Sequence, residues 1–382
     1  MSKKDVVTER LSTTDEHGAR VFVYAARIKG YFNSHRTKVH AFLILLFLIL
    51  PWLKINGEQS LLLDLPNRRF NFFGLILWAH DAPLFFFVLA IIVFSLALVT
   101  AVWGRLWCGW ACPQTVFIDA IFRRIDEFVE GSYIRRIKRD KGPWTASKVI
   151  RKIIKVSIYL FITLIITHSF LAYFVGTDNL ADMISSPPNQ NWFSFGFIVF
   201  TTAALMFDFL WFREQFCLIM CPYGRFQSIL MDEHSLAPLY DEKRGEPRRG
   251  RVKDQKDQGD CVNCFKCVTV CPTGIDIRNG MQMECVACTA CMDACDSIME
   301  KIDKPKGLIR YNSEAGLENK KRFRPRVLIY SVSLLISAIG LIYFLNERNP
   351  YSISLLRQKG APFKVLEGEA LNYTNFFPTF FK

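Results

Sequence analysis

The sequence has few charged residues for its length: Asp, Glu, Lys and Arg make up 22% of its 382 residues, whereas hydrophobic residues make up 51%. Soluble domains carry more polar surface than this, and the mean hydropathy of +0.17 also argues against a soluble chain. So much apolar material excludes a disordered chain. Dispersed cysteines are missing as well, because the 12 cysteines fall into tight clusters, and this excludes a secreted domain built on disulfides.

Charged residues are almost absent from five long apolar runs: 38–55, 83–103, 152–175, 192–212 and 327–345. Each run is close to the ~20 residues that a helix needs to cross a bilayer. We therefore predict an α-helical integral membrane protein with about five transmembrane helices. Residues 1–37 are polar and charged and lack the apolar core of a cleavable signal peptide, so the first span is expected to stay in the protein.

The net charge of +13 is concentrated in alternate connections between these runs. Lys and Arg are frequent in residues 1–37, after the second run and in residues 213–326, but scarce after the first and third runs. The positive-inside rule then predicts a cytoplasmic amino terminus and an external carboxyl-terminal tail. Because topology explains the basic residues, we expect the lipid bilayer as a partner and no nucleic acid.

This topology divides the chain into a series of segments. A cytoplasmic amino-terminal segment at 1–37 precedes a membrane domain of four spans at 38–212. A cytoplasmic segment at 213–326, a fifth span at 327–345 and a short external tail at 346–382 follow. The 213–326 segment holds ten of the 12 cysteines. It is predicted to contain an inserted cytoplasmic two-cluster ferredoxin-like (α+β) domain over residues 250–310 or so.

Eight of these cysteines form two runs with the spacing C-x2-C-x2-C-x3-C. Pro272 follows the first run, whereas Asp296 stands in that place after the second. In such pairs of runs three close thiolates bind three irons of one cubane, and the fourth iron takes a cysteine from the other run. Two [4Fe-4S] clusters are therefore predicted. The ligands would be Cys261, Cys264, Cys267 and Cys295 for cluster one, and Cys285, Cys288, Cys291 and Cys271 for cluster two.

Zinc and disulfides are the alternatives for these cysteines. Structural zinc sites usually join two C-x-x-C pairs that lie a dozen or more residues apart, and two four-cysteine runs fit this pattern poorly. Disulfides are rare in a cytoplasmic segment. The double run therefore favours iron–sulfur clusters.

The other four cysteines form a second internal repeat, C-x-x-x-C-P, with an arginine upstream of each pair. Cys108 and Cys112 follow the second apolar run, and Cys217 and Cys221 follow the fourth. If each helix continues through its pair, residues four apart share one face, and two helices can present four thiolates. Soft thiolates favour Cu(I), zinc or an iron–sulfur cluster. These four are the candidate catalytic residues and would hold copper or a third cluster; packing alone is the alternative.

Three other features have plainer explanations. His168 lies inside the third apolar run, where an ionisable residue is a functional candidate, although a hydrogen bond to a neighbouring helix is the simpler expectation. Asp208 is expected to pair with Arg213 at the end of the fourth run. Met281 and Met283 are expected to pack around a cluster.

These motifs resemble one family, the bacterial CcoG/FixG/RdxA proteins, which are accessory factors of cbb-type cytochrome c oxidase. The resemblance rests on GRLWCGWACPQTVF at 104–117, FREQFCLIMCPYGRFQS at 212–228, YDEKRGEPR at 240–248, GDCVNCFKCVTVCPTGIDIRNGMQ at 259–282 and KGLIRY at 306–311. It implies a multi-pass polyferredoxin of the bacterial inner membrane that reduces Cu(II) to Cu(I) while copper is supplied to the oxidase. It also implies that the C-x-x-x-C-P cysteines handle copper.

The resemblance further implies partners that traffic copper and assemble the oxidase. For the electron supply we expect a cytoplasmic donor such as a flavodoxin or a ferredoxin, which Arg248, Arg249 and Arg251 would steer if it is acidic. Family members usually continue into an external immunoglobulin-like domain. The 37 residues at 346–382 are too few for such a domain of ~100 residues, which we expect to be absent or truncated.

Two other functions would use the same ligands. A quinol-coupled ferredoxin subunit would relay electrons to a periplasmic reductase and would need a quinone pocket between spans. A non-catalytic scaffold for oxidase assembly would need the clusters only for its structure.

Overall fold

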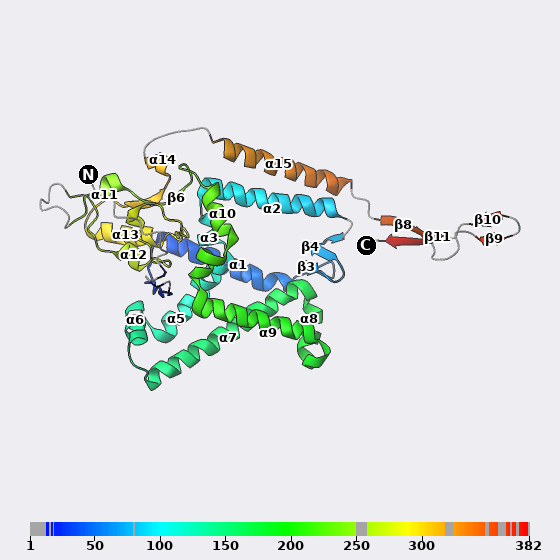
Figure 1. The fold of residues 1–382 in the computed structure, drawn as a ribbon, viewed down its shortest axis with the longest axis horizontal. Helices are drawn as coiled ribbons and strands as arrows, with labels where there is room; N and C mark the ends of the chain where they lie inside the picture. The colour runs from blue at the N-terminus through cyan, green and yellow to red at the C-terminus, as the bar shows by residue number, and fades with distance from the viewer. Residues whose placement is uncertain are drawn as a thin grey trace.

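The computed structural model describes residues 13, 14, 17, 19–78, 81–249, 258–317, 324–347, 351–357, 364–366, 369–371 and 374–380. Within these residues the chain is mostly helical (Figure 1), and five helices are long and apolar enough to cross a membrane. They are α1 (Tyr31–Ile49, extended by the 3-10 turn Leu50–Trp52), α2 (Ala82–Trp103), α7 (Ala146–Val175), α9 (Trp192–Phe207, extended by the π turn Asp208–Phe212) and α15 (Pro325–Asn346). The predicted set of five candidate spans is confirmed by length and composition.

The long helices begin and end at residues suited to those positions. The Thr145 side chain accepts a hydrogen bond from the Lys148 N–H (3.3 Å) and so caps the start of α7. Gly176 ends the same helix at φ +90°, which a residue with a side chain rarely adopts. Pro325 is the first residue of α15, and its lack of an N–H costs no hydrogen bond because the first N–H groups of a helix have no acceptor within it.

The first helix starts earlier than the apolar run predicts, at Tyr31 rather than 38, and it ends before residue 55. Its first turns contain buried Arg36, which donates to the Asp119 carboxylate (2.7 Å) and to the Cys288 carbonyl oxygen (2.6 Å). Because protein partners satisfy this cation, the helix tolerates a residue that hydropathy places outside the membrane. The residues after the helix form short strands instead.

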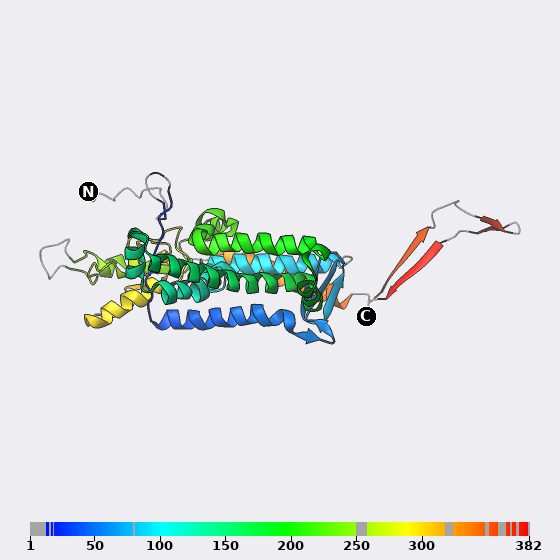
Figure 2. The same cartoon turned by 90° about the horizontal axis from the view of Figure 1, so that it is seen from below.

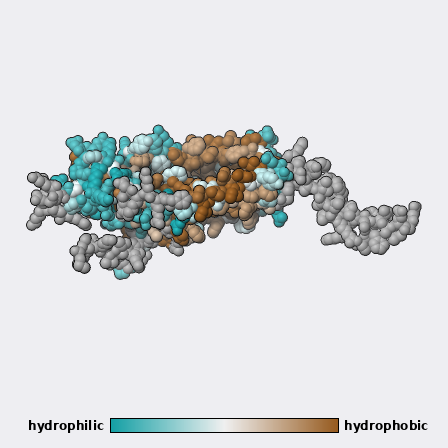
Figure 3. All heavy atoms as spheres, turned by 90° about the horizontal axis from the view of Figure 1, so that it is seen from above, coloured by the Kyte–Doolittle hydropathy of each residue, from teal (hydrophilic) through white to brown (hydrophobic). Residues whose placement is uncertain are grey.

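The two ends of the helix bundle differ. At one end a three-stranded antiparallel sheet, β3–β4–β5, joins α1 to α2, and at the other lies the ferredoxin-like segment (Figures 1 and 2). Figure 3 shows a hydrophobic band between hydrophilic ends. Beyond α15, β8 pairs with β11 and β9 pairs with β10. The strands are β1 (Lys54–Ile55), β2 (Glu58–Gln59), β3 (Leu61–Asp64), β4 (Arg69–Phe72), β5 (Leu75–Trp78), β8 (Tyr351–Arg357), β9 (Lys364–Leu366), β10 (Glu369–Leu371) and β11 (Thr374–Phe380).

Short helices gather at the ferredoxin-like end of the bundle. They are α3 (Leu106–Trp110), α4 (Pro113–Phe117), the π turn Ile118–Phe122, α5 (Arg123–Glu130), α6 (Tyr133–Lys141), the π turn Phe216–Met220 and α10 (Pro222–Leu230). At the other end, α8 (Thr177–Ser185) and the 3-10 turn Pro188–Gln190 connect α7 to α9. The two C-x-x-x-C-P motifs lie among the first group.

The ferredoxin-like segment has the predicted mixture of helix and strand. Strands β6 (Ala237–Tyr240) and β7 (Ile309–Asn312) pair antiparallel, and they cover a core that includes Tyr240, Met299 and Leu308. The helical elements are α11 (Glu242–Gly245), α12 (Lys266–Thr269), the 3-10 turn Ile277–Asn279, α13 (Ala290–Lys301) and α14 (Glu314–Leu317).

A buried carboxylate, Asp126, ties the elements at this end together. It is 0% exposed and contacts Arg213 (2.8 Å), Arg136 (2.9 Å) and the donating hydroxyl of Tyr159 (2.8 Å). Burial opposes its charge, but the surrounding cations hold the pKa of Asp126 below its usual value. The expected pairing of Asp208 with Arg213 is wrong: Asp208 instead accepts a hydrogen bond from the Gln114 side chain (2.6 Å).

We predict that Asp126→Asn lowers the free energy of unfolding by about 3–5 kcal/mol, because it leaves the buried Arg213 guanidinium without its counter-ion and removes one of the two carboxylates that pair with Arg136. Thermal unfolding of the detergent-purified protein measures the change. Asp178→Asn is the matched control, since Asp178 pairs with Lys54 but its side chain is 80% exposed. The control is expected to shift stability by less than about 1 kcal/mol. Equal shifts in the two variants would contradict the prediction.

Candidate iron–sulfur and thiolate site

The two cysteine runs share an unusual backbone conformation. In each run the residues on both sides of the second cysteine have left-handed dihedrals: Asn263 (φ +56°), Phe265 (φ +55°), Ala287 (φ +52°) and Thr289 (φ +62°). Such angles cost roughly 1–2 kcal/mol for a residue with a side chain. Strain of this kind persists where the surroundings enforce it, often at functional sites. Its repetition at equivalent positions shows that the same loop is built twice.

The structure brings the eight run cysteines together around two small cavities. One cavity is lined by Cys261, Cys264, Cys267 and Cys295, and the other by Cys271, Cys285, Cys288 and Cys291, with Cys267 between them. Each set combines three cysteines of one run with the last cysteine of the other, which is the grouping predicted from the spacing. Among the described residues, no three His, Cys, Asp or Glu side chains converge on one ion-sized point. The assignment of ligands to two clusters stays a prediction that this arrangement fits.

Burial keeps several of these thiols neutral in the absence of a positive centre. It raises the pKa of Cys267 to about 11 and the pKa values of Cys285 and Cys295 to about 12. Burial and the neighbouring Cys288 also raise the pKa of Cys271 and Cys291. Because the thiolate is the ligand, the positive charge of bound iron is what would remove these protons. The donor set therefore fits a cationic iron–sulfur centre.

The missing proline after the second run has a local consequence. Cys295 lies inside α13, which continues to Lys301, whereas α12 ends at Thr269, before Cys271 and Pro272. Asp296 does not interrupt the helix, and its carboxylate accepts a hydrogen bond from the Gly307 N–H (2.8 Å). Cys295 nevertheless lines the first cavity with the other predicted ligands of cluster one.

A helix does not continue through either C-x-x-x-C-P pair, so the condition for a shared helical face is not met. Cys112 (φ −62°, ψ 126°) and Cys221 (φ −71°, ψ 111°) are extended, and a new helix begins at the proline after each. Proline disfavours the helical conformation in the residue before it and suits the first position of a helix. In both pairs the second cysteine donates its N–H five residues back, to Trp107 (2.9 Å) or Phe216 (2.8 Å). The two C-x-x-x-C-P motifs therefore share a backbone conformation as well as a sequence pattern.

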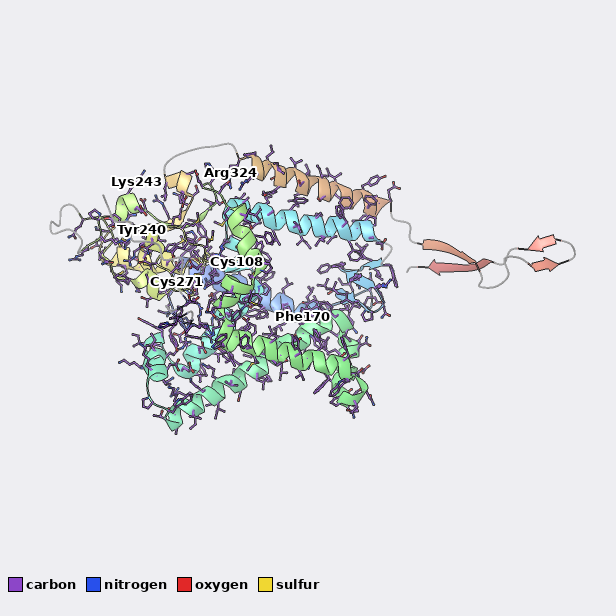
Figure 4. The ribbon with its side chains drawn as sticks, in the orientation of Figure 1. Cys108, Phe170, Tyr240, Lys243, Cys271 and Arg324 are labelled. Atoms are coloured by element: carbon purple, nitrogen blue, oxygen red, sulfur yellow. The ribbon has the colours of Figure 1, made fainter. Side chains whose placement is uncertain are left out.

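The two pairs nevertheless meet in space, and we call Cys108, Cys112, Cys217 and Cys221 the four-thiolate site. Burial, and then the thiol of Cys112, raise the pKa of Cys108 to about 11, with Cys221 also contributing. Burial, and then Cys112, Cys108 and Cys221, raise the pKa of Cys217. The four thiols are therefore close enough to influence one another's pKa values. Figure 4 shows Cys108 at the junction of the helix bundle and the ferredoxin-like segment.

Polar contacts between the two motifs hold this site together. The Arg105 guanidinium donates to the Gly224 carbonyl oxygen (2.7 Å), and the Cys108 thiol donates to the Gln227 side-chain oxygen (3.3 Å). The hydroxyls of Thr100 and Tyr223 lie 2.7 Å apart. Sequence reasoning missed Gln227, because nothing in its local pattern indicates a partner 119 positions away.

Gly109, which sequence reasoning also missed, packs directly on the loop of cluster two. A Cβ atom at this position would lie 2.6 Å from the carbonyl oxygens of both Val286 and Ala287. Cys108 shares a hydrophobic core with Val286 and Cys288. A glycine between two bulky tryptophans in the first C-x-x-x-C-P motif was the available signal. The segment that carries Cys108 is thus in backbone contact with the loop that holds three of the predicted ligands of cluster two, Cys285, Cys288 and Cys291.

Comparison with known families supports the iron–sulfur prediction. Residues 212–314 match the family described as 4Fe-4S dicluster domain, and residues 84–140 match the family described as 4Fe-4S binding domain. The first match contains both cysteine runs with Cys217 and Cys221, and the second contains Cys108 and Cys112.

Several curated proteins are similar to this chain over most of its length. Nitrogen fixation protein FixG of Rhizobium meliloti is 33% identical over 90% of this chain and 73% of its own. Protein RdxA of Cereibacter sphaeroides is 35% identical over 83% of this chain and 70% of its own, and protein RdxB of the same organism is 34% identical over 95% and 80%. No solved structure matches.

The exchange of the last cysteine between the two runs predicts which variants behave alike. Cys295→Ser should change the same EPR signal of the reduced protein as Cys261→Ser, although the two cysteines lie in different runs. Cys271→Ser should match Cys285→Ser instead. Each variant is expected to lose at most about half of the bound iron, since one of two clusters is touched. If each run binds its own cluster, Cys295→Ser will instead match Cys285→Ser.

Proposed function

Because the chain belongs to the FixG/RdxA family and is a membrane-associated 4Fe-4S electron-transfer protein, we propose that it reduces Cu(II) to Cu(I) for the assembly of a cbb-type cytochrome c oxidase. In this proposal electrons enter at the two clusters and leave at the four-thiolate site. Copper-trafficking and oxidase assembly proteins would supply and receive the metal.

The contact at Gly109 is the observation that carries the proposal. A side chain there would collide with the backbone of Val286 and Ala287, so α3 and the loop of cluster two are packed without an intervening side chain. Arg36 fastens the same loop to α1 through the Cys288 carbonyl oxygen (2.6 Å). An electron on cluster two therefore has a short, rigid path to Cys108.

The residues at the end of this path suit copper in its reduced state. A [4Fe-4S] cluster supplies reversible one-electron transfer when bound. Thiolates are soft ligands that favour Cu(I), so Cys108, Cys112, Cys217 and Cys221 would stabilise the product of the reduction. The step adds one electron to Cu(II) and needs no proton or leaving group. A third iron–sulfur cluster on the same four thiolates would extend the relay by one centre.

Exposure of cluster one supports it as the point of electron entry. Cys264 is exposed, and Phe265 beside it is 51% exposed. A flavodoxin or ferredoxin-like donor would dock at this edge. The role proposed for nearby arginines has less support, because Arg248 is paired with Glu246. Arg251 lies outside the described residues.

We place the ferredoxin-like end on the cytoplasmic side of the bacterial inner membrane. Basic residues of α6 and of the start of α7 lie at this end, and the positive-inside rule then orients it toward the cytoplasm. They include Arg135, Lys138, Arg139, Lys148 and Arg151. Trp144, which is 72% exposed between these helices, suits the membrane–water interface.

Anaerobic mixing of the reduced protein with Cu(II) tests the proposal. We expect the cluster absorbance to recover its oxidised form while a Cu(I)-specific chelator reports one Cu(I) per electron. Cys217→Ser/Cys221→Ser should slow this reaction at least about tenfold while leaving the eight run cysteines intact, equivalent to about 1.4 kcal/mol of activation free energy. An unchanged rate in this variant would contradict a role of the four-thiolate site. If the reduced clusters are not oxidised by Cu(II), the result would favour the non-catalytic scaffold.

Gly109→Ala probes the carrying contact in the same assay. The added methyl group overpacks the interface, at a cost of about 1–3 kcal/mol, and separates α3 from the loop of cluster two. We expect slower copper reduction with normal iron content. Gly196→Ala is the control, because a Cβ there meets nothing within 4 Å. Equal rates in the two variants would show that the contact is not part of the path.

A groove between α7 and α9 favours quinol oxidation as a second candidate function. It has a volume of about 620 Å³, is mostly apolar, and is lined by His168, Asn191, Ser194 and Thr202 among other residues. The His168 Nδ1–H donates a hydrogen bond to the Leu164 carbonyl oxygen (2.7 Å) within α7, rather than to a neighbouring helix as expected. Apolar walls with a few polar groups suit a quinone head and its tail.

Addition of a short-chain quinol to the oxidised protein separates the two functions. If quinol is the donor, the cluster absorbance bleaches, and His168→Leu slows the bleaching because the head group loses its polar partner. Ser169→Ala is the neighbouring control outside the residues that line the groove. Unbleached clusters in the unmodified protein would remove the quinol-coupled function.

A further inference from the structure

A second sulfur-rich feature lies beside cluster two. A cavity of about 260 Å³ is bounded by the end of α10, by β6 and by the loop that leads to Cys285. Three of the protein's nine methionines line it: Met231, Met281 and Met283. Met281 and Met283, which are expected to pack around a cluster, line this cavity together with Cys285, and they are also 37% and 69% exposed. Their side chains are accessible to an ion from solution.

The backbone around these methionines is fixed by hydrogen bonds. The Cys285 N–H donates to the Gln282 carbonyl oxygen (3.1 Å), and the Gln282 side chain donates to the Asp276 carbonyl oxygen (2.6 Å). Met281 and Met283 therefore lie on either side of Gln282, which these hydrogen bonds hold in place. The Met231 N–H donates to the Gln227 carbonyl oxygen at the end of α10 (2.9 Å).

The charges around the cavity disfavour a hard cation. The carboxylate of Asp232 already accepts a hydrogen bond from the Arg324 guanidinium (2.9 Å), and Arg105 adds a positive charge to the lining. Besides Asp232, only Glu314 and Gln282 bring side-chain oxygens to the lining, which is fewer than the six or more oxygen ligands that magnesium and calcium need. Thioether sulfur is neutral and soft, binds Cu(I) well and needs no proton removed. The chemistry of the lining therefore selects a soft monovalent metal.

We propose that Met231, Met281 and Met283 form a Cu(I)-binding site that is separate from the four-thiolate site; its role in copper delivery rests on the proposed function. Cys285 lines the same cavity and is a predicted ligand of cluster two. Copper in the cavity would therefore lie beside a predicted ligand of cluster two. Reduced cluster two would give one electron to Cu(II) and be oxidised by one electron, no proton would move, and the thioethers would hold the resulting Cu(I).

Cu(I) binding to the whole detergent-purified protein tests this site. A Cys108→Ser/Cys112→Ser/Cys217→Ser/Cys221→Ser background removes all four ligands of the four-thiolate site, so that the cavity dominates binding of added Cu(I). In this background Met231→Leu/Met281→Leu/Met283→Leu replaces each thioether with a side chain of similar volume, which keeps the fold. Met183→Leu/Met206→Leu is the matched control, because those methionines line the α7–α9 groove. Anaerobic competition with a chromogenic Cu(I) chelator gives the affinity.

We expect the triple leucine variant to bind Cu(I) at least about tenfold more weakly than its background. A tenfold loss of metal affinity is the smallest that is typical when a residue supporting a metal ligand is substituted, and loss of the ligands themselves should cost at least as much. The control pair should leave the affinity unchanged, and both should keep their iron and cluster EPR signals. The double variant Met281→Leu/Met283→Leu, which changes only the two more exposed residues, should lose affinity in the same direction. Unchanged affinity in the triple variant with intact clusters would overturn the proposal.

Cu(II) reduction measured on the same methionine variants, in the unmodified cysteine background, separates this proposal from the proposed function. Thioether-dependent Cu(I) binding without any Cu(II) reduction would support the cavity and count against the reductase. If Cu(II) reduction is normal and the leucine substitutions leave the Cu(I) affinity unchanged, the result would count against the cavity alone.

Discussion

The link between the helix bundle and the iron–sulfur segment depends on the close packing of α3 against the loop that contains Val286 and Ala287. Gly109 lets α3 approach the carbonyl oxygens of Val286 and Ala287 so closely that no side chain fits between them. The Cys108 side chain then joins the apolar core formed by the loop residues. Because α3 carries Cys108 of the four-thiolate site, this contact links the membrane domain to the iron–sulfur segment.

A second set of contacts keeps that junction in place within the membrane domain. Charged groups at the ends of the spanning helices are buried against each other, with Asp126 between Arg213 and Arg136 and with Asp119 beside Arg36. Pairing offsets the cost of burying each charge. The junction is thus rigid on both sides, and a rigid arrangement keeps the distance between redox centres constant.

Much of the site could be predicted from sequence because ligand spacing in short loops is a local property. The grouping of the eight run cysteines follows from their spacing, and the lining of the two cavities agrees with it. Apolar length likewise sufficed to find the five candidate spans. The local rule for proline before a new helix was also in the sequence, at Pro113 and Pro222, and it overrides the helical periodicity that predicted a shared face for each cysteine pair.

Partners that lie far apart in the sequence could not be predicted. The start of α1 depends on contacts of Arg36 with Asp119 and Cys288, and Arg213 chooses Asp126 over the nearby Asp208. The methionines at 281 and 283 face a cavity that exists only once α10 and β6 are folded beside them. In each case tertiary packing, rather than local pattern, decides the role of the residue.

Redox titration of the anaerobically purified whole protein, followed by EPR with iron and sulfide counts, tests the central claim most directly. Two adjacent clusters on eight thiolates predict at least about eight irons per chain and EPR signals that broaden through magnetic interaction once both centres are reduced. A folded protein without iron, or one whose reduced signals stay independent of each other, would contradict the claim that these cysteines form a continuous electron path.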